Sequence, residues 1–154
     1  MQTKHRNFVI TNENSSKMKN IQNKSDLLSI LWIFVTLNYL YCDLIGLMDS
    51  TLLKQYLEGE VDGLIITPQF LLIAGILMEI PIAMVLLSRI LAPKLNIKFN
   101  LFASALKTIV MLLTLFIGVP TGYYLFFAFV EIGTTLFIFW YTWQWRKQYL
   151  QQIT

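Results

Sequence analysis

Four long runs of apolar residues divide the chain, and more polar segments separate them. The runs cover approximately residues 27–46, 69–91, 100–118 and 122–145. Each has about 19–24 residues, and an α-helix of about 20 residues crosses the roughly 30 Å hydrocarbon core of a bilayer. None shows the strict alternation that is typical of barrel strands. The pattern therefore predicts an all-α integral membrane bundle of four helices.

Polar segments flank this predicted bundle. Residues 1–25 are rich in Asn, Ser and Lys and are predicted to form a disordered tail. Residues 26–147 are predicted to form the membrane domain, and residues 148–154 a short second tail. The first apolar run is not expected to be a cleavable signal sequence, because a long polar segment precedes it and no small-residue cleavage site follows it. Met18 is an alternative start position.

Composition excludes two broad classes of protein. Of the 154 residues, 56% are hydrophobic and 14% are charged, whereas soluble domains carry about 25% charged residues. An ordinary soluble globule and a disordered chain are both disfavoured. The net charge of +3 is small, and no folded basic surface is indicated, so we expect no nucleic-acid partner.

The basic residues are distributed unequally between the two predicted sides of the membrane. Of the 12 Lys and Arg residues, ten precede the first run, follow the last or lie between the second and third. The first loop contains Lys54 alone, and Lys107 lies within the third run. Cytoplasmic segments of membrane proteins carry an excess of Lys and Arg, so both termini are predicted to be cytoplasmic. The tryptophans are expected at the same interface; they are Trp32, Trp140, Trp143 and Trp145.

The first loop, residues 47–68, is the only sizeable segment between runs, and it is predicted to lie outside the membrane. Asp49 or Ser50 is a suitable N-cap for a short amphipathic helix that would end at Gly59. Its apolar positions are Leu52, Leu53, Tyr56 and Leu57. Such a helix would lie flat on the outer leaflet or cover the bundle. A solvated connector is the alternative.

Every predicted span carries a polar side chain near its midpoint. These side chains are Asn38, Glu79, Lys107 and Glu131. At about 1.5 Å per residue, all four lie within a few Å of one plane. A charge at mid-bilayer costs roughly 2.5–3.5 kcal/mol, so we expect these groups to face the bundle interior and to meet there. Two carboxyl groups that share one ammonium form a coupled set able to hold and release a proton.

Asp43 lies higher in the first span, about 10 Å towards the predicted outer face. We expect it at the entrance of the interior site, with Tyr39 or Tyr41 as a hydrogen-bond partner. Cys42 is the only cysteine, so neither an intrachain disulfide nor a cysteine metal site is expected. We predict no metal and no cofactor.

Three segments carry a resemblance to a known family. They are LWIFVTLNYLYCD at 31–43, GLMD at 46–49 and EIPIAMVLLSR at 79–89. Over approximately residues 25–145 the chain resembles a family of small bacterial four-span membrane proteins of unknown function. The resemblance implies an inner-membrane location but no reaction. It places these residues at family motif positions: Asn38, Tyr39, Asp43, Asp49, Glu79, Pro81 and Arg89.

A looser likeness links the chain to emopamil-binding-type four-span proteins. That group also has an acidic residue in its first helix and a Glu before a Pro in its second, and it binds or isomerises lipophilic, often cationic, molecules. The spacing between Glu79 and Pro81 differs from that pattern, no histidine lies in a predicted span, and Lys107 has no counterpart. The likeness therefore concerns the fold alone.

The predicted function follows from the polar plane. We expect Glu79, Glu131, Lys107 and Asn38, with Asp43 and Tyr39 near the entrance, to bind or move a proton, a cation or a small amphiphilic ligand. A transporter of this size would work as a homo-oligomer. One alternative is a structural or accessory protein in which the polar plane only fixes helix packing. Another is an intramembrane isomerase-like enzyme acting on a lipophilic substrate, although no Ser/His/Asp set or phosphate loop is present.

Overall fold

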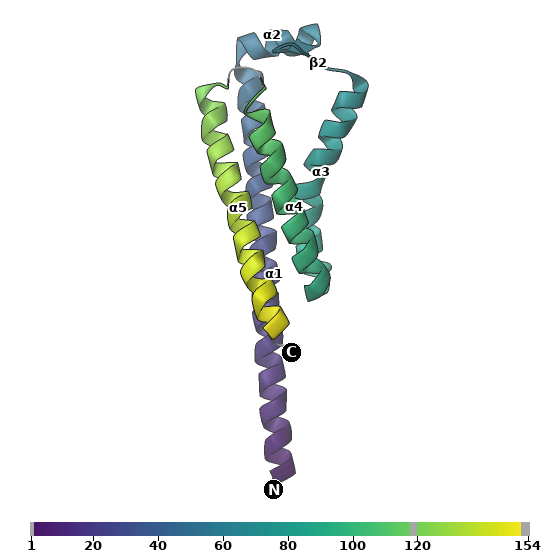
Figure 1. Cartoon of the computed structure of the whole chain (residues 1–154), viewed down its shortest axis with the longest axis vertical. Helices are drawn as coiled ribbons and strands as arrows, with labels where there is room; N and C mark the ends of the chain where they lie inside the picture. Colours follow the sequence, from purple (N-terminus) through teal and green to yellow (C-terminus); the bar gives the residue numbers. More distant parts are fainter. Residues whose placement is uncertain (1, 118–119, 152–154) are drawn as a thin grey trace.

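Four long helices and one short helix form the protein, which confirms the predicted all-α bundle. The computed structural model describes residues 2–117 and 120–151. The elements, in chain order, are α1 (Gln2–Met48), α2 (Ser50–Glu58), β1 (Glu60–Val61), β2 (Leu64–Ile65), α3 (Pro68–Ile90), α4 (Pro93–Thr114) and α5 (Gly122–Gln151). The long helices alternate in direction along the bundle (Figure 1).

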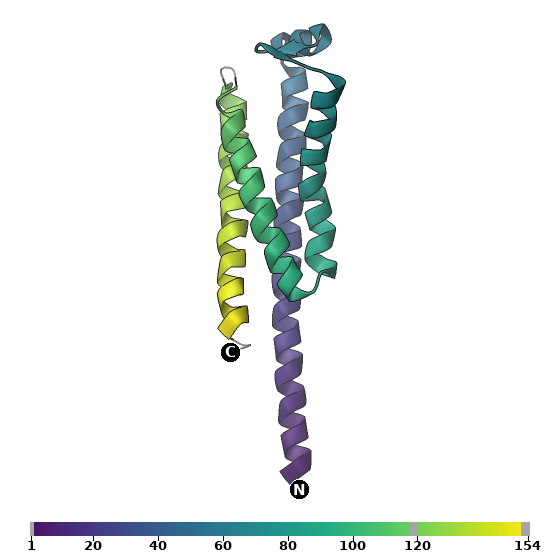
Figure 2. The same cartoon turned by 45° about the vertical axis from the view of Figure 1, so that its right-hand side comes forward.

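The bundle consists of two helix pairs. α3 packs on α1, α4 packs on α5, and α1 also contacts α5; Figure 2 shows the α1–α3 pair beside the α4–α5 pair. α2 and the two strands lie at one end, here called the hairpin end. The chain termini lie at the other, here called the terminal end, where α1 extends well beyond the bundle (Figure 1).

Four helices are long and apolar enough to cross a membrane. By length and composition these are Ser15–Met48, Pro68–Ile90, Pro93–Thr114 and Gly122–Gln151. The second and fourth of these helices begin within one residue of the corresponding predicted runs. The third begins at Pro93 rather than near residue 100, because Pro at the first helical position loses no hydrogen bond there. The chain is therefore a multi-pass membrane protein.

The first helix is much longer than the sequence predicts. The structure has one helix from Gln2 to Met48, where a disordered tail was predicted over residues 1–25. No Pro occurs before Pro68 and no Gly before Gly46, so no residue interrupts the helix once the apolar run has nucleated it.

The predicted helix in the first loop is confirmed. The Asp49 carboxylate caps α2 by accepting hydrogen bonds from the backbone N–H groups of Thr51 at 2.9 Å and Leu52 at 3.3 Å. Gly59 ends the helix with a φ of 77°, a left-handed conformation that favours glycine. α2 lies across the hairpin end (Figure 1).

A β-hairpin follows α2, and the sequence predictions above do not include it. β1 and β2 are antiparallel, with Val61 opposite Leu64. Asp62 and Gly63 form the two-residue turn with φ values of 50° and 82°. Two positive φ values are the signature of a type I′ turn, and Asp-Gly is one of its preferred sequences. The Asp-Gly pair was therefore the signal for this hairpin.

A buried polar network joins α1, α3 and α4 towards the terminal end. Asn100 accepts a hydrogen bond from the Trp32 indole N–H at 2.7 Å and donates to the Asn96 side-chain oxygen at 2.6 Å. Asn96 donates to the backbone oxygen of Ser88 at 2.6 Å and to the Ser25 hydroxyl at 3.2 Å. Asn96, Asn100, Ser88 and Trp32 are fully buried. Such interhelical bonds fix how the three helices pack.

This network corrects part of the predicted tryptophan belt. Trp32 and Trp145 are buried in the bundle, with 0% and 3% of their surface exposed. Trp140 and Trp143 are exposed, as an interfacial position requires. The indole of Trp32 turns inward because Asn100 offers its N–H a buried acceptor.

Candidate functional site

Lys107 on α4 is the buried cation of the bundle interior. Only 3% of its surface is exposed. Its ammonium lies 4.0 Å from the centre of the Tyr39 ring on α1 and 3.5 Å from the backbone oxygen of Leu77 on α3. An ammonium over an aromatic face is attracted by the electrons of the ring. Lys107 therefore links three helices at one point.

Pro81 explains why the Leu77 oxygen is available. A proline inside a helix has no N–H, so the carbonyl four residues earlier loses its helical hydrogen bond. Pro81 lies inside α3 and is buried. Lys107 approaches the oxygen of Leu77, four residues before Pro81. The second span thus supplies a backbone acceptor to the interior.

Glu131 on α5 is the buried anion of the same region. It is 1% exposed, and neither of its carboxyl oxygens has a hydrogen-bond partner in the described part of the chain. It interacts electrostatically with Lys107 and with Asp43. A buried carboxylate without hydrogen bonds is costly. A buried carboxyl group without hydrogen bonds therefore makes Glu131 a candidate functional residue.

The structure joins only part of the predicted polar plane. Asn38 is half-buried, and its amide donates to the backbone oxygen of Phe34 in its own helix at 2.9 Å. Glu79 is exposed on α3, facing away from the interior. Neither side chain is brought to Lys107 and Glu131, although both were predicted there. Depth in the membrane follows from position along a helix, but direction depends on helix rotation, which the sequence did not settle.

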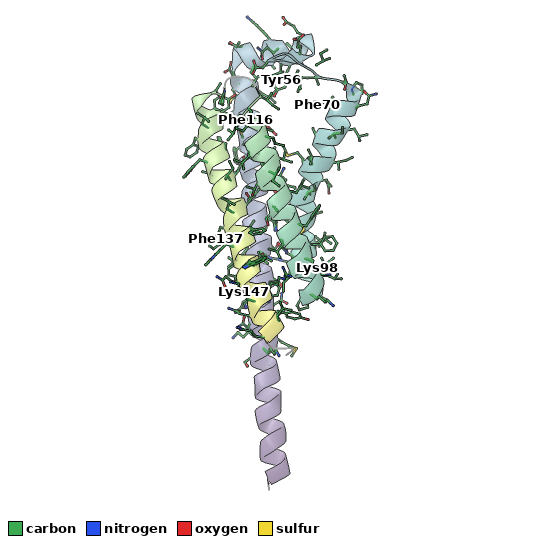
Figure 3. The ribbon with its side chains drawn as sticks, viewed as in Figure 1. Tyr56, Phe70, Lys98, Phe116, Phe137 and Lys147 are labelled. Atoms are coloured by element: carbon green, nitrogen blue, oxygen red, sulfur yellow. The ribbon has the colours of Figure 1, made fainter. Side chains whose placement is uncertain are left out.

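A cavity of about 260 Å³ lies at the hairpin end, above the buried Lys107 and Glu131. Every helix and both strands contribute at least one residue to its lining. The residues that matter for its chemistry are two carboxylates and four aromatic rings: Asp43, Asp62, Tyr56, Phe70, Tyr123 and Tyr124. Figure 3 shows Tyr56 and Phe70 at this end of the molecule.

Asp43 connects the cavity to the buried charges. Its side chain lines the cavity and interacts electrostatically with Lys107. The predicted hydrogen bond to Tyr39 is absent, since the buried Tyr39 hydroxyl has no partner among the described residues. Asp43, rather than Glu79, is therefore the second carboxyl group that interacts electrostatically with Lys107.

Two local features shape the cavity. Gly46 allows close packing at its wall: a side-chain carbon there would lie 3.3 Å from Leu52 on α2 and 3.4 Å from the Tyr123 hydroxyl. The Tyr124 hydroxyl donates to the Thr114 hydroxyl at 2.8 Å and ties α5 to α4. Burial, followed by the nearby Asp43 charge, raises the pKa of Tyr56.

Several lining residues were not predicted. Asp62 reaches the cavity because of the unpredicted hairpin, and Phe70, Tyr123 and Tyr124 lie in the first turns of α3 and α5. Aromatic residues at span ends are usually interfacial anchors. No pattern in the sequence indicates that these rings converge on one cavity.

Fold and site together define the class: a four-span membrane protein with an acidic, aromatic-lined cavity at one end and two buried ionisable residues, Lys107 and Glu131, in its interior. The chain belongs to the DUF6326 family, a family of unknown function whose model matches residues 17–152. No curated protein matches the chain. No solved structure matches it either.

Proposed function

We propose that this protein binds a small amphiphilic cation in the cavity at the hairpin end. One observation carries the proposal: Asp43 and Asp62 share the cavity with four aromatic rings. Carboxylates attract an organic cation, and aromatic faces bind ammonium groups while also packing against apolar parts. The volume of about 260 Å³ is slightly below the roughly 300–1,000 Å³ of drug-sized ligand sites, so the ligand would be small.

The charge balance supports a cationic ligand. Asp43 and Glu131 both interact electrostatically with Lys107, the one ammonium buried among these groups. With both carboxyl groups ionised, a single ammonium leaves a deficit of positive charge in this region. A bound cation, or a proton, would compensate it. An anionic ligand would add to the repulsion.

The test uses benzyltrimethylammonium as the probe and phenylmethanesulfonate as its anionic counterpart. We expect the protein in nanodiscs to bind the cation saturably, as measured by calorimetry, and not to bind the anion. Asp43→Asn should weaken cation binding by about tenfold or more, because a partly desolvated charge–charge contact contributes about 1.5–3 kcal/mol.

Glu60→Gln is the matched control. Glu60 is an exposed carboxylate of the hairpin at the same end of the molecule and does not line the cavity, so the variant removes one negative charge outside the site. The affinity of this variant for benzyltrimethylammonium should stay within about twofold of the affinity of the unsubstituted protein, as expected for a screened surface charge. Absence of saturable cation binding, or equal loss in both variants, contradicts the proposal.

A structural role is the second candidate, and one contact favours it. The Lys107 ammonium already has the Tyr39 ring and the Leu77 oxygen as partners, so it needs no ligand in order to be stable. In that case the polar groups only hold the helices in register. Binding measurements that contradict the first proposal would leave this role.

We further propose that both termini are cytoplasmic and that the cavity opens to the opposite side. The basic residues support this orientation, since Lys54 is the only one in the loop at the hairpin end. In a Cys42→Ser background, Lys54→Cys should react with a membrane-impermeant maleimide in intact cells, and Lys147→Cys only after lysis. The reverse labelling pattern would establish the opposite orientation.

A further inference from the structure

α3 has one face against the bundle and one face free. Its buried residues are Pro81, Met84 and Ser88. Glu79 lies about 140–180° around the helix from all three, at 100° per residue. Its side chain is exposed, and 11% of the most apolar stretch of α3 is buried, against 28–39% in the other spans. Glu79 therefore faces the surrounding lipid.

A glutamate cannot remain uncovered at this depth without a large cost. Glu79 is eleven residues from both Pro68 and Ile90, the first and last residues of α3, which is about 16 Å from each end. Its short side chain cannot reach either interface over that distance. A charged group facing lipid at mid-bilayer costs roughly 2.5–3.5 kcal/mol or more. A polar partner outside this bundle is required.

The residues around Glu79 form a regular contact surface, here called the α3 seam. Its members are Leu72, Gly75, Glu79, Ile82 and Leu86, which are separated alternately by three and four residues. All are exposed. This spacing is that of two helices packed side by side along a left-handed seam. A Cβ placed on Gly75 would meet nothing within 4 Å, so a second helix has room to approach there.

We infer that the α3 seam is the contact surface for a second copy of this chain. Two copies related by a twofold axis along the membrane normal place their α3 helices parallel, with Glu79 opposite Glu79. A protonated carboxyl group is both donor and acceptor, so identical groups satisfy one another across the axis. The apolar residues of the α3 seam then pack against the same residues of the other copy.

Disulfide cross-linking in liposomes that contain only the purified protein tests the geometry. In a Cys42→Ser background, Leu72→Cys and Leu86→Cys should each form covalent dimers. Ile73→Cys is the matched control: it lies on the same helix and is 60% exposed, against 65% for Leu72, but is displaced by 100° from it. Equal cross-linking at positions 72 and 73 would overturn the proposal.

Dimer affinity, measured by energy transfer between labelled copies as lipid is added, tests the role of Glu79. Glu79→Leu should raise the dissociation constant by roughly 3- to 30-fold, the effect of losing an interhelical hydrogen bond in a membrane. Glu79→Gln keeps a donor and an acceptor and should dimerise nearly as well as the unsubstituted chain. Since Glu79 is exposed, neither variant should impair folding.

Two further outcomes would contradict the inference. A chain that stays monomeric at all protein-to-lipid ratios has no self-contact, and its Glu79 would then need a different partner with a basic residue in its span. A Glu79→Leu dimer as tight as the unsubstituted one would show that Glu79 does not direct the contact. Neither outcome bears on cation binding, because Glu79 does not line the cavity.

Discussion

Replacing Lys107 with methionine is expected to lower the free energy of unfolding by about 3–5 kcal/mol. Methionine fills a similar volume but leaves the buried Glu131 carboxylate without its compensating charge. The Tyr39 ring and the Leu77 oxygen also lose their cationic partner. The measurement is reversible unfolding in mixed micelles, followed by the fluorescence of the buried tryptophans.

The double variant Lys107→Met/Glu131→Met distinguishes a charge effect from a packing effect. With both charges removed, stability should return to within about 1 kcal/mol of the unsubstituted protein or exceed it, because apolar replacement of a buried pair is often neutral or stabilising. Lys98→Met is the control, since Lys98 is an exposed residue of the same helix, and it should change stability by less than about 0.5 kcal/mol. A double variant as unstable as Lys107→Met would show that packing causes the loss.

The second large effect is expected at Asn100. Asn100→Ala should lower the free energy of unfolding by about 3 kcal/mol, because it leaves the Trp32 indole N–H and the Asn96 oxygen without partners at buried positions. The same unfolding measurement applies. The loss of the Trp32 hydrogen bond should also shift the indole fluorescence, which reports the site directly.

Asn38→Ala provides the comparison for this prediction. The substitution is the same, but Asn38 is half-buried, and among the described residues its amide donates to the backbone of its own helix and to no other helix. We expect its removal to change stability by no more than about 0.5 kcal/mol. If the two alanine variants were equally destabilised, the network around Asn100 would not hold the helices together as its geometry indicates.

The three polar features of the spans therefore have different roles. The Asn96–Asn100 network is fully hydrogen-bonded and fixes the packing of α1, α3 and α4. The carboxyl oxygens of Glu131 lack hydrogen bonds in the described part of the chain, close beneath an acidic cavity. Glu79 points out of the bundle altogether. The hydrogen-bonded groups hold the helices together, and the unpaired Glu131 oxygens are the candidates for a functional role.

The architecture was predictable because it depends on local properties of the chain. Span length follows from the apolar runs, since the bilayer thickness sets the number of residues needed. The cap at Asp49 and the end of α2 at Gly59 follow from short-range hydrogen bonding and backbone conformation. That some ionisable groups are buried follows from the cost of a charge in lipid, although this cost did not distinguish Lys107 and Glu131 from the exposed Glu79. These predictions did not require knowing which helices are neighbours.

The sequence by itself thus determined that the chain has four spans, a capped α2 and ionisable groups at mid-membrane depth. Only the tertiary structure decided which of those groups meet. Glu79 and Glu131 lie at similar depth, yet α5 turns Glu131 inward and α3 turns Glu79 outward. The packing of α1 likewise decided that Asp43 interacts electrostatically with Lys107. Helix rotation is set by side-chain packing over the whole interface, and no single position in the sequence encodes it.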